Sequence, residues 1–348
     1  MCEQVRGVAV TADDERSSEC DPRGVIVICT RDRPVEVGFA CTAANAAAPN
    51  TPILVVDASS TDATRRACAA LADDPHGSRL KLTYHAASRP GLARQRNEAV
   101  EICRRMKAEV IHFIDDDTVV SSGYFEAIEE RFHGDPHCFG VGGVIVNQPR
   151  VTFLGFKRLF LLGSRRRGSV LRSGRVMLGQ YPGTSPTDPV EWLSGCSMSY
   201  RIGAFDEIAF DDRLEGASIG EDYDFSFRLS RQHALVIEPA ATCVHHLTPT
   251  ARSSRRAHAR TRTQLIHRRA SEYRALGLSP SAFWWSTLGD FLLRGMHGML
   301  RLDARSLHEA LGVAEGAVAV LRTPAPASQQ APPTTAATER LTTQEPIR

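Results

Sequence analysis

Residues 110–117 read VIHFIDDD, a short apolar run that ends in three consecutive carboxylates. Four to six β-branched and apolar residues bounded by polar ones are typical of a buried strand, so we expect a strand here. Similar runs occupy 25–29, 53–56 and 80–84. Helix-forming segments follow these runs, after Pro34 and at 63–71 and 92–106. Strands that alternate with helices in this way predict an α/β fold with a mostly parallel central sheet.

Polar clusters follow three of these strands directly, at 30–33, 57–62 and 115–117. Parallel sheets bind ligands beyond the carboxyl ends of their strands, so we expect the three clusters to meet in one crevice. Asp and Ser also cap helices, which leaves any single cluster ambiguous. The three clusters together favour a binding site.

The aspartates at 115–117 would repel one another unless they were solvated or neutralised. Oxygen-only ligands suit magnesium or manganese, and magnesium takes one or two protein carboxylates and completes its shell with water and substrate phosphate. In an extended segment, Asp115 and Asp117 lie on one side and Asp116 on the other. The stretch therefore predicts a metal site, with a solvated acidic turn as the alternative.

A second acidic cluster, GEDYD at 220–224, begins a helical stretch that ends near residue 231. Acidic residues in a first helical turn are favoured by the helix dipole, and Asp224 and Arg228 form a plain i, i+4 pair. A glycine followed by paired carboxylates would also present a base to a substrate. Taken alone, the cluster leaves both interpretations open.

Two adjacent histidines, His245 and His246, end a strand-like run over 234–244. Neighbouring residues of a strand point to opposite faces, so at most one of the two faces the crevice. A lone histidine is more often structural than a ligand. The residues themselves therefore leave the role of this pair open.

Together these motifs resemble the family-two glycosyltransferases, which have a Rossmann-like GT-A fold, over residues 24–250. The match lies in five segments: ICTRDRP at 28–34, VVDASSTD at 55–62, RPGLAR at 89–94 followed by Asn97, FIDDD at 113–117 and GED at 220–222. Each segment alone is modest, but five in this order are specific. The sequence departs from the family pattern at Ala58, and the acceptor region between 150 and 190 has no pattern that we can assign.

The resemblance implies a site for a nucleotide-diphospho-sugar donor. Its residues would be Thr30, Arg31, Arg33, Asp57, Ser59, Arg89, Gly91, Arg94, Asp115 and Asp116. Within this set, Asp57 would accept a hydrogen bond from the nucleotide base, and Asp115 would contact the ribose or the sugar. Arg89, Gly91 and Arg94 would line the nucleotide and diphosphate side.

A divalent cation, manganese or magnesium, is the cofactor that the resemblance implies. Asp117 would hold this cation on the diphosphate, together with Asp115. His245 or His246 would supply the additional metal or diphosphate contact found in several members of the family. The strand register does not decide between the two histidines.

The resemblance also implies the residues on the acceptor side. Asp222 would take the proton from the acceptor hydroxyl, and Glu221 would position the acceptor. The acceptor and the donor sugar would meet at Trp192, Gly195 and Cys196.

The activity implied is an inverting, metal-dependent transfer of a hexosyl or related group to a hydroxyl. The acceptor would be a saccharide, a lipid-linked molecule or a small molecule, in the synthesis of cell-envelope polysaccharide or glycoconjugates. A leaving nucleoside diphosphate needs charge neutralisation by a metal more than a general acid. One carboxylate base on the opposite face of the sugar then suffices for inversion.

Two alternative functions fit parts of the sequence. Residues 115–119, DDDTV, match the D-x-D-x-[TV] pattern of haloacid dehalogenase-like phosphohydrolases. In those enzymes the first aspartate usually follows the first strand, whereas three strand–helix units precede Asp115 here. A non-catalytic membrane-surface protein on a degenerate GT-A fold is the second alternative, and the intact Asp117 and Asp222 argue against it.

The charge of the chain is close to neutral only on average, with 42 cations against 40 anions and a net charge of +2. Residues 136–187 contain no carboxylate, and 252–274 carry arginines against Glu272 alone. Such blocks favour an anionic acceptor or a membrane surface. An apolar helical stripe follows them, at Phe283, Trp284, Trp285, Leu288, Phe291, Leu292 and Met296. The stripe would lie on a membrane or pack against the catalytic domain. We expect no nucleic acid partner, because no recognised reading module is present.

We expect four regions along the chain: a loose leader at 1–23, a GT-A domain at 24–250, a helical appendage at 251–322 and a disordered tail at 323–348. The appendage is basic first and amphipathic after that. The scattered cysteines, the acidic N-terminal segment and the absence of a long uncharged apolar run predict a cytoplasmic protein. The inner face of the membrane is the alternative location.

Overall fold

The computed structural model describes residues 24–73, 80–148, 155–183, 189–214, 219–246, 254–274 and 277–322. The expected leader at 1–23 and tail at 323–348 lie outside the described residues. The strands are β1 (Gly24–Thr30), β2 (Ile53–Asp57), β3 (Leu82–Ala86), β4 (Val110–Asp115), β5 (Thr118–Val120), β6 (Cys138–Ile145), β7 (Ser197–Arg201) and β8 (Ala234–His245). The first helices are α1 (Pro34–Ala47), α2 (Ala63–Ala72), α3 (Leu92–Arg105), α4 (Tyr124–Gly134) and α5 (Gly155–Leu159). They are followed by the 3-10 helix η1 (Ile202–Phe205), α6 (Glu221–Leu229), α7 (Ser254–Arg274), α8 (Pro280–Arg301) and α9 (Ala304–Arg322).

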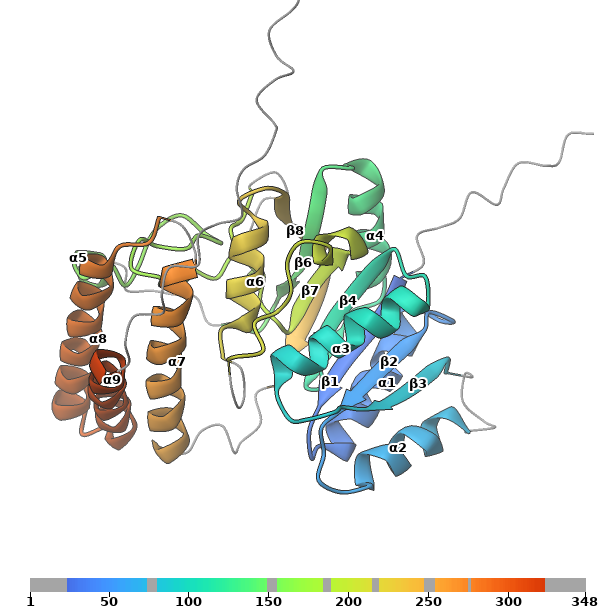
Figure 1. Cartoon of the computed structure of the whole chain (residues 1–348), viewed down its shortest axis with the longest axis horizontal. Coiled ribbons are helices and arrows are strands. Elements are labelled where there is room, and N and C mark those ends of the chain that lie inside the picture. Colours follow the sequence, from blue (N-terminus) through green and yellow to red (C-terminus); the bar gives the residue numbers. More distant parts are fainter. Residues whose placement is uncertain are drawn as a thin grey trace, which may run out of the picture.

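The described strands form one sheet in the order β3-β2-β1-β4-β7-β6-β8-β5. Strands β3, β2, β1 and β4 are parallel, and β6 and β8 are parallel to each other. Strands β7 and β5 run antiparallel to their neighbours. The sheet is therefore mostly parallel and flanked by helices (Figure 1), which confirms the α/β class expected from the sequence.

Two hydrophobic cores cover the two faces of the sheet. The first includes Val27 and Leu54 of the sheet and packs them against residues of α3, η1 and α6, among them Phe225. The second includes Ile26 and packs the other face against α1, α2 and α4, among them Tyr124. Because alternate residues of β1 enter opposite cores, the apolar run at 25–29 is buried on both faces.

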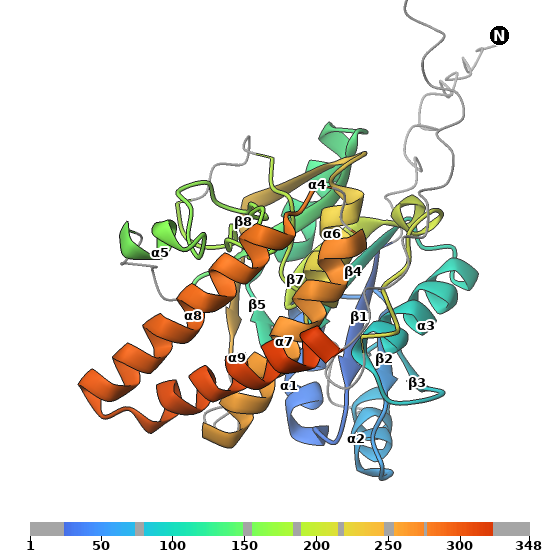
Figure 2. The ribbon, with the colours of Figure 1, turned by 60° about the vertical axis from the view of Figure 1, so that its left-hand side comes forward.

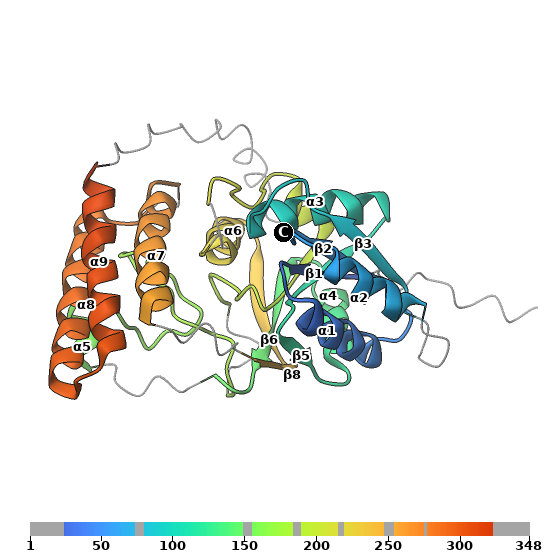
Figure 3. The ribbon, with the colours of Figure 1, turned by 90° about the horizontal axis from the view of Figure 1, so that it is seen from below.

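Helices α7, α8 and α9 form a separate group at the end of the molecule away from β3, which Figure 3 shows from below. Their small core contains Leu265, Phe283 and Val313. Figure 2 shows α8 and α9 as an antiparallel pair. The C-terminal helical region expected from the sequence is thus present. Within the described part of the chain, no helix is both long and apolar enough to span a bilayer.

The segment between α5 and β7 connects this helical group to the rest of the molecule. The backbone N–H of Ser279 donates to the carbonyl of Arg172 at 2.8 Å, and the indole of Trp285 donates to the carbonyl of Leu159 at 2.8 Å. The region between 150 and 190, to which we could assign no sequence pattern, therefore contacts the first turns of α8.

Candidate active site

The ends of three parallel strands bring the expected donor residues together. Thr30 pairs with Asp57 in the register of β1 and β2, and Cys29 pairs with Asp115 in the register of β1 and β4. The buried amide of Gln95 in α3 donates to the carbonyl oxygens of Thr30 and Val56, both at 2.9 Å. Gln95, which the sequence analysis did not select, therefore fixes the ends of β1 and β2 relative to each other.

Asp115, Asp117 and His245 form a cluster in which one ligand atom of each residue lies within 4.8 Å of the others. His245 Nε2 is 3.0 Å from Asp117 Oδ1. The pairing of β5 with β8, which sets Thr118 opposite His245, creates this proximity. The side chain of His246 is exposed, and its backbone N–H donates to the carbonyl of Asp117 at 2.7 Å. Of the two histidines, His245 is the one whose ring reaches the aspartates.

The donor atoms of this cluster fit a divalent cation. Carboxylate oxygens suit magnesium and manganese, and an imidazole nitrogen extends the choice to softer divalent ions. Burial lowers the pKa of His245, but hydrogen bonds to Asp117 and Cys196 outweigh it and raise this pKa to about 10. Burial opposes the ionisation of Asp117, yet His245 and Arg33 hold its pKa below the ordinary value. A bound cation would displace the proton of His245, because a metal ligand must be deprotonated.

Asp116 faces a different set of partners. Thr30 Oγ1 donates to Asp116 Oδ2 at 2.6 Å, and the guanidinium of Arg33 contacts Asp116 and donates to Asp117 Oδ2 at 3.0 Å. Burial raises the pKa of Asp116 to about 7, against the opposing effects of Thr30 and Arg33. Arg33 therefore lies between two carboxylates and links the first strand end to the acidic turn.

Asp57 is buried, and both of its carboxylate oxygens accept hydrogen bonds. The backbone N–H of Ser59 donates to Oδ1 at 2.9 Å, and the Ser59 hydroxyl donates to the same oxygen. The hydroxyl of Tyr84 donates to Oδ2 at 2.9 Å. Tyr84 was not selected from the sequence, although it lies on the neighbouring strand β3. Each carboxylate oxygen has two lone pairs, so Oδ2 can accept one further hydrogen bond.

The remaining expected donor residues lie at the rim. Arg31 is exposed and pairs with Asp32 at 3.6 Å, and Arg89 is also exposed. Arg94 is partly buried, 3.6 Å from the exposed Asp212. Gly91 precedes α3 with φ 145°, a conformation that side-chain-bearing residues rarely adopt. The binding of a nucleotide by these residues stays a prediction.

Arg96, another residue of α3 that the sequence analysis did not select, connects the two acidic clusters. Its side chain is 2% exposed and contacts Glu221, while Nη2 donates to the carbonyl of Gly195 at 3.2 Å and lies 3.5 Å from Asp115. Burial raises the pKa of Glu221 to about 8, and Arg96 opposes this shift. Burial would lower the pKa of Arg96, but Glu221 and Asp115 raise it, so the guanidinium stays charged.

Asp222 lies in the first turn of α6, beside Arg96 and its partners. Gly220 precedes the helix with φ 98°. The carboxylate of Asp222 accepts hydrogen bonds from the backbone N–H of Gly195 at 2.9 Å and from that of Tyr223 at 2.8 Å. Two backbone donors fix this carboxylate on the wall of a pocket.

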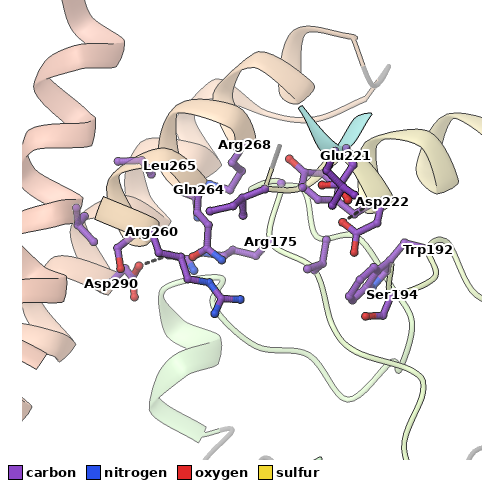
Figure 4. A pocket seen from close by; sticks show the side chains of 18 residues that line it. Arg175, Trp192, Ser194, Glu221, Asp222, Arg260, Gln264, Leu265, Arg268 and Asp290 are labelled. Atoms are coloured by element: carbon purple, nitrogen blue, oxygen red, sulfur yellow. Dashed lines mark hydrogen bonds and ion pairs between the residues drawn. The ribbon is translucent and has the colours of Figure 1, made fainter. Parts of the chain in front are cut away.

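The pocket has a volume of about 400 Å³ and lies between α6 and the C-terminal helices. Figure 4 shows Asp222, Trp192 and Ser194 on one side and Arg260 and Gln264 of α7 on the other. The lining is completed by Leu92, Gly174, Arg175, Val176, Ile219, Gly220, Glu221, Tyr223, Thr261, Leu265, Arg268, Asp290 and Val313.

The three residues expected at the meeting point of acceptor and sugar have different positions. Trp192 lines the pocket and its indole donates to the carbonyl of Met177 at 2.9 Å. Gly195 holds Asp222 and Arg96 through its backbone. Cys196 is 2% exposed, is not among the residues that line the pocket, and hydrogen-bonds with His245.

Comparison with known proteins agrees with this geometry. Residues 25–182 match the model of Glycosyl transferase family 2. A comparison with curated proteins found no match.

Two solved structures are similar to this chain. The mannosyltransferase PcManGT from Pyrobaculum calidifontis, solved in complex with GDP-Man and Mn²⁺, is 16% identical with a TM-score of 0.54, over 86% of this chain and 87% of that chain. The structure of GalNAc-T7 with UDP, GalNAc and Mn²⁺ is 14% identical with a TM-score of 0.50, over 72% of this chain and 48% of that chain. At these identities the likeness shows the fold, which is the expected GT-A fold. Residues 25–182 are therefore similar to Glycosyl transferase family 2, and the chain has the GT-A fold.

Proposed function

We propose that this chain is an inverting glycosyltransferase that moves a sugar from a nucleotide-diphospho-sugar to a hydroxyl acceptor, with Asp222 as the general base. The observation that carries the proposal is the position of Arg96. Its guanidinium contacts Asp115 of the candidate cation cluster and Glu221, the neighbour of Asp222. A donor diphosphate held at the cluster would thus lie beside the proposed base.

The donor side is supported by the acidic cluster and by the similar structures, which contain GDP-Man or UDP together with Mn²⁺. We assign Asp115, Asp117 and His245 as the residues that hold manganese or magnesium. The cation would neutralise the charge that develops on the leaving diphosphate. Arg33 would add a guanidinium to the same phosphate region, and Asp57 would accept a hydrogen bond from the base.

The geometry of Asp222 suits a base. Two backbone N–H groups orient its carboxylate and leave further lone pairs available to a hydroxyl in the pocket. A single base opposite the leaving group gives direct displacement and therefore inversion at the anomeric carbon. Glu221 is buried against Arg96, so we assign it to positioning rather than proton transfer.

The cations of the pocket favour an anionic acceptor. Arg175 is paired with Asp290, and Arg268 donates to the hydroxyl of Thr287 at 2.8 Å. Arg260 is exposed, and among the described residues no ion pair of its side chain is present. We assign Arg260 as the first contact of a phosphate or carboxylate on the acceptor. An anionic acceptor at the inner face of a membrane would fit a role in cell-envelope polysaccharide or glycoconjugate synthesis.

The test begins with a panel of nucleotide sugars, screened with manganese for thermal stabilisation of the protein. With the donor that stabilises it, Asp222→Asn should lower turnover by about 10²–10⁴-fold, the usual contribution of a general base. Stabilisation by donor and manganese should persist in this variant, because Asn keeps the acceptor for the Gly195 N–H. Asp117→Ala should instead lose the manganese-dependent stabilisation.

The matched control is Glu126→Gln, a change of an exposed acid on α4 that should alter neither turnover nor donor binding. Unchanged turnover in Asp222→Asn would refute the base assignment. Retained manganese dependence in Asp117→Ala would refute the cation assignment. Product with the anomeric configuration of the donor would refute inversion.

A further inference from the structure

Helix α8 carries most of its large apolar side chains on the outside. Its buried residues are mostly small or polar: Ala282, Phe283, Ser286, Thr287, Gly289, Asp290 and Gly298. Its exposed residues include Trp285, Leu288, Phe291, Leu292, Met296, Met299 and Leu300, with exposed fractions from 40% to 76%. A helix that packs only against protein has the opposite distribution.

Helix α9 has the same distribution. Its buried residues are Ala310, Gly312, Val313 and Gly316. Leu307, Leu311, Val318 and Leu321 are exposed and follow the three- and four-residue spacing of one helical face. Leu302, in the turn between α8 and α9, is 91% exposed. The two helices therefore each expose an apolar stripe.

The short helix α5 extends this surface. Phe156 and Leu159 are 58% and 60% exposed. The indole of Trp285 donates to the carbonyl of Leu159 at the end of α5, so α5 and α8 are in direct contact. The ring of Phe160, the next residue, lies 5.2 Å from that of Trp285. We call the exposed apolar side chains of α5, α8 and α9 the outer face. Contiguous exposed apolar surfaces of this kind mark interaction sites, because isolated domains rarely keep them.

The charges beside the outer face identify its partner. Segment 155–183 contains seven cations, Lys157, Arg158, Arg165, Arg166, Arg167, Arg172 and Arg175, and no carboxylate. The first five of these side chains are exposed. In α8 and α9, by contrast, four arginines are accompanied by three carboxylates, so most of the excess positive charge lies at the α5 end. Apolar side chains bordered by cations suit a surface that is apolar inside and anionic outside.

We propose that the outer face docks on a bilayer containing anionic lipid, with α8 and α9 lying in the interface plane. The cations favour a bilayer over a second copy of this chain as the partner. The outer face of a second copy would carry the same positive charge, and the two faces would repel each other. None of the described helices has the length and apolarity to cross the bilayer, so they would lie on it. The side chains of α8 and α9 would enter the leaflet, and the cations near α5 would contact the headgroups.

This inference extends the proposed function by placing the pocket near the lipid. Asp290 faces the pocket from the buried side of α8, and the apolar stripe occupies the opposite side. A helix is about 10 Å across, so the pocket would lie about one helix diameter from the lipid surface. An acceptor anchored in the bilayer would then reach Arg260 and Asp222.

The test uses the full chain and two kinds of vesicle, pure phosphatidylcholine and phosphatidylcholine with phosphatidylglycerol. In sedimentation, the protein should bind the anionic vesicles and bind the neutral ones far less. The double variant Met299→Glu, Leu300→Glu should lose at least tenfold in binding. Lys157→Gln and Arg158→Gln should each weaken binding by about fivefold, the effect of one cation near an anionic surface.

The matched control is Val35→Glu with Phe39→Glu, two residues of α1 that are 65% and 68% exposed. This variant should bind vesicles like the unchanged protein. The proposal would be overturned if the double variant of Met299 and Leu300 bound anionic vesicles as well as the unchanged protein does. It would also be overturned if the unchanged protein did not bind these vesicles. A dimer, seen by light scattering, that only the Met299 and Leu300 variant dissociates would overturn it as well.

Vesicle binding needs neither a donor nor transfer. Asp222→Asn should therefore bind vesicles normally, and the docking proposal can fail or succeed independently of the proposed base.

Discussion

The ion cluster around Asp290 should stabilise the helical region measurably. Asp290 in α8 contacts Arg175 of the preceding segment and accepts from Arg294 Nε at 2.8 Å, and Arg294 also contacts Glu309 of α9. The Asp290 side chain is 10% exposed, while those of Arg175 and Arg294 are 25% and 29% exposed. Breaking a fully buried pair costs about 3–5 kcal/mol. Because solvent partly screens both arginines, we expect Asp290→Asn to cost about 2–3 kcal/mol.

Urea unfolding followed by tryptophan fluorescence measures this cost, because Trp284 and Trp285 lie in the same helix as Asp290. The midpoint should fall at an unchanged slope. The control is Glu315→Gln on α9, an exposed acid paired with His258, which should change the free energy of unfolding by less than about 1 kcal/mol. A loss below about 0.5 kcal/mol in Asp290→Asn would refute the reasoning, since surface changes have effects of that size.

The pH dependence provides a second check. Burial raises the pKa of Asp290, but Arg175 and Arg294 outweigh it and hold this pKa below the ordinary value of 3.8. A depressed carboxyl pKa gives stabilisation that is complete above the unfolded pKa and is lost as the pH falls through the folded pKa. The unchanged protein should therefore exceed Asp290→Asn in free energy of unfolding by the same amount at about pH 7 and about pH 5.5. This difference in free energy should become smaller near pH 3. If this difference in free energy grew as the pH fell, the pKa of Asp290 would not be lowered in the folded protein, and the reasoning would be contradicted.

Three further changes test the site. Gly195→Ala would place a Cβ 2.8 Å from Arg96 Nη2, so we expect transfer to fall about tenfold and stability by about 1–3 kcal/mol, measured by kinetics and urea unfolding. A Gly195→Ala protein with normal kinetics would show that Arg96 can move freely. Gln95→Leu removes hydrogen bonds to two buried carbonyls and should cost about 2–4 kcal/mol in the same unfolding assay; a cost near zero would show that the bonds are dispensable. Removal of divalent cations with EDTA should abolish transfer, and added manganese should restore it; activity that survives EDTA would exclude a required exchangeable cation.

Much of the parallel half of the sheet could be predicted from the sequence, because β1, β2 and β4 are buried on both faces and form continuous apolar runs. Strand β4 was expected at 110–114 and is observed at Val110–Asp115. Strand β6 was not predicted, because Gly140, Gly142 and Gly143 weaken any strand pattern. These glycines are explained by packing: a Cβ at Gly143 would lie 2.5 Å from the ring of Tyr124, which no local pattern reveals.

The candidate site was predictable where polar residues follow strands, and not where a helix buries a polar side chain. Asp57 and Asp115 follow apolar runs and were selected for that reason. Arg96 lies among the buried residues of α3, at the spacing of Ala93 and Cys103, where an apolar residue is expected. The one sequence signal for a role of Arg96 was its position on an apolar helical face. Its carboxylate partner Glu221 lies 125 residues away, so no local pattern could reveal the pair.

The residues of the apolar stripe on α8 were predicted from the sequence, but which of them face the protein and which face outward was not. Phe283 packs inward against the core of the helical group, whereas Trp285 and Leu292 are exposed. The spacing of apolar residues defines a face of a helix, and only the packing of α8 against its neighbours, mainly α9, determines which face is left outside.

The pairing of β5 with β8 makes the candidate cation cluster form late in folding. Asp115 and Asp117 leave the ribosome well before His245, and the histidine reaches them only when Thr118 pairs with His245. A nascent chain that ends before β8 therefore has two aspartates without their third partner. Contacts of such long sequence separation form slowly, because the entropy of closing the loop must be overcome first. The ability to hold a cation with all three ligands would thus distinguish a chain whose sheet is complete from one that is still being assembled.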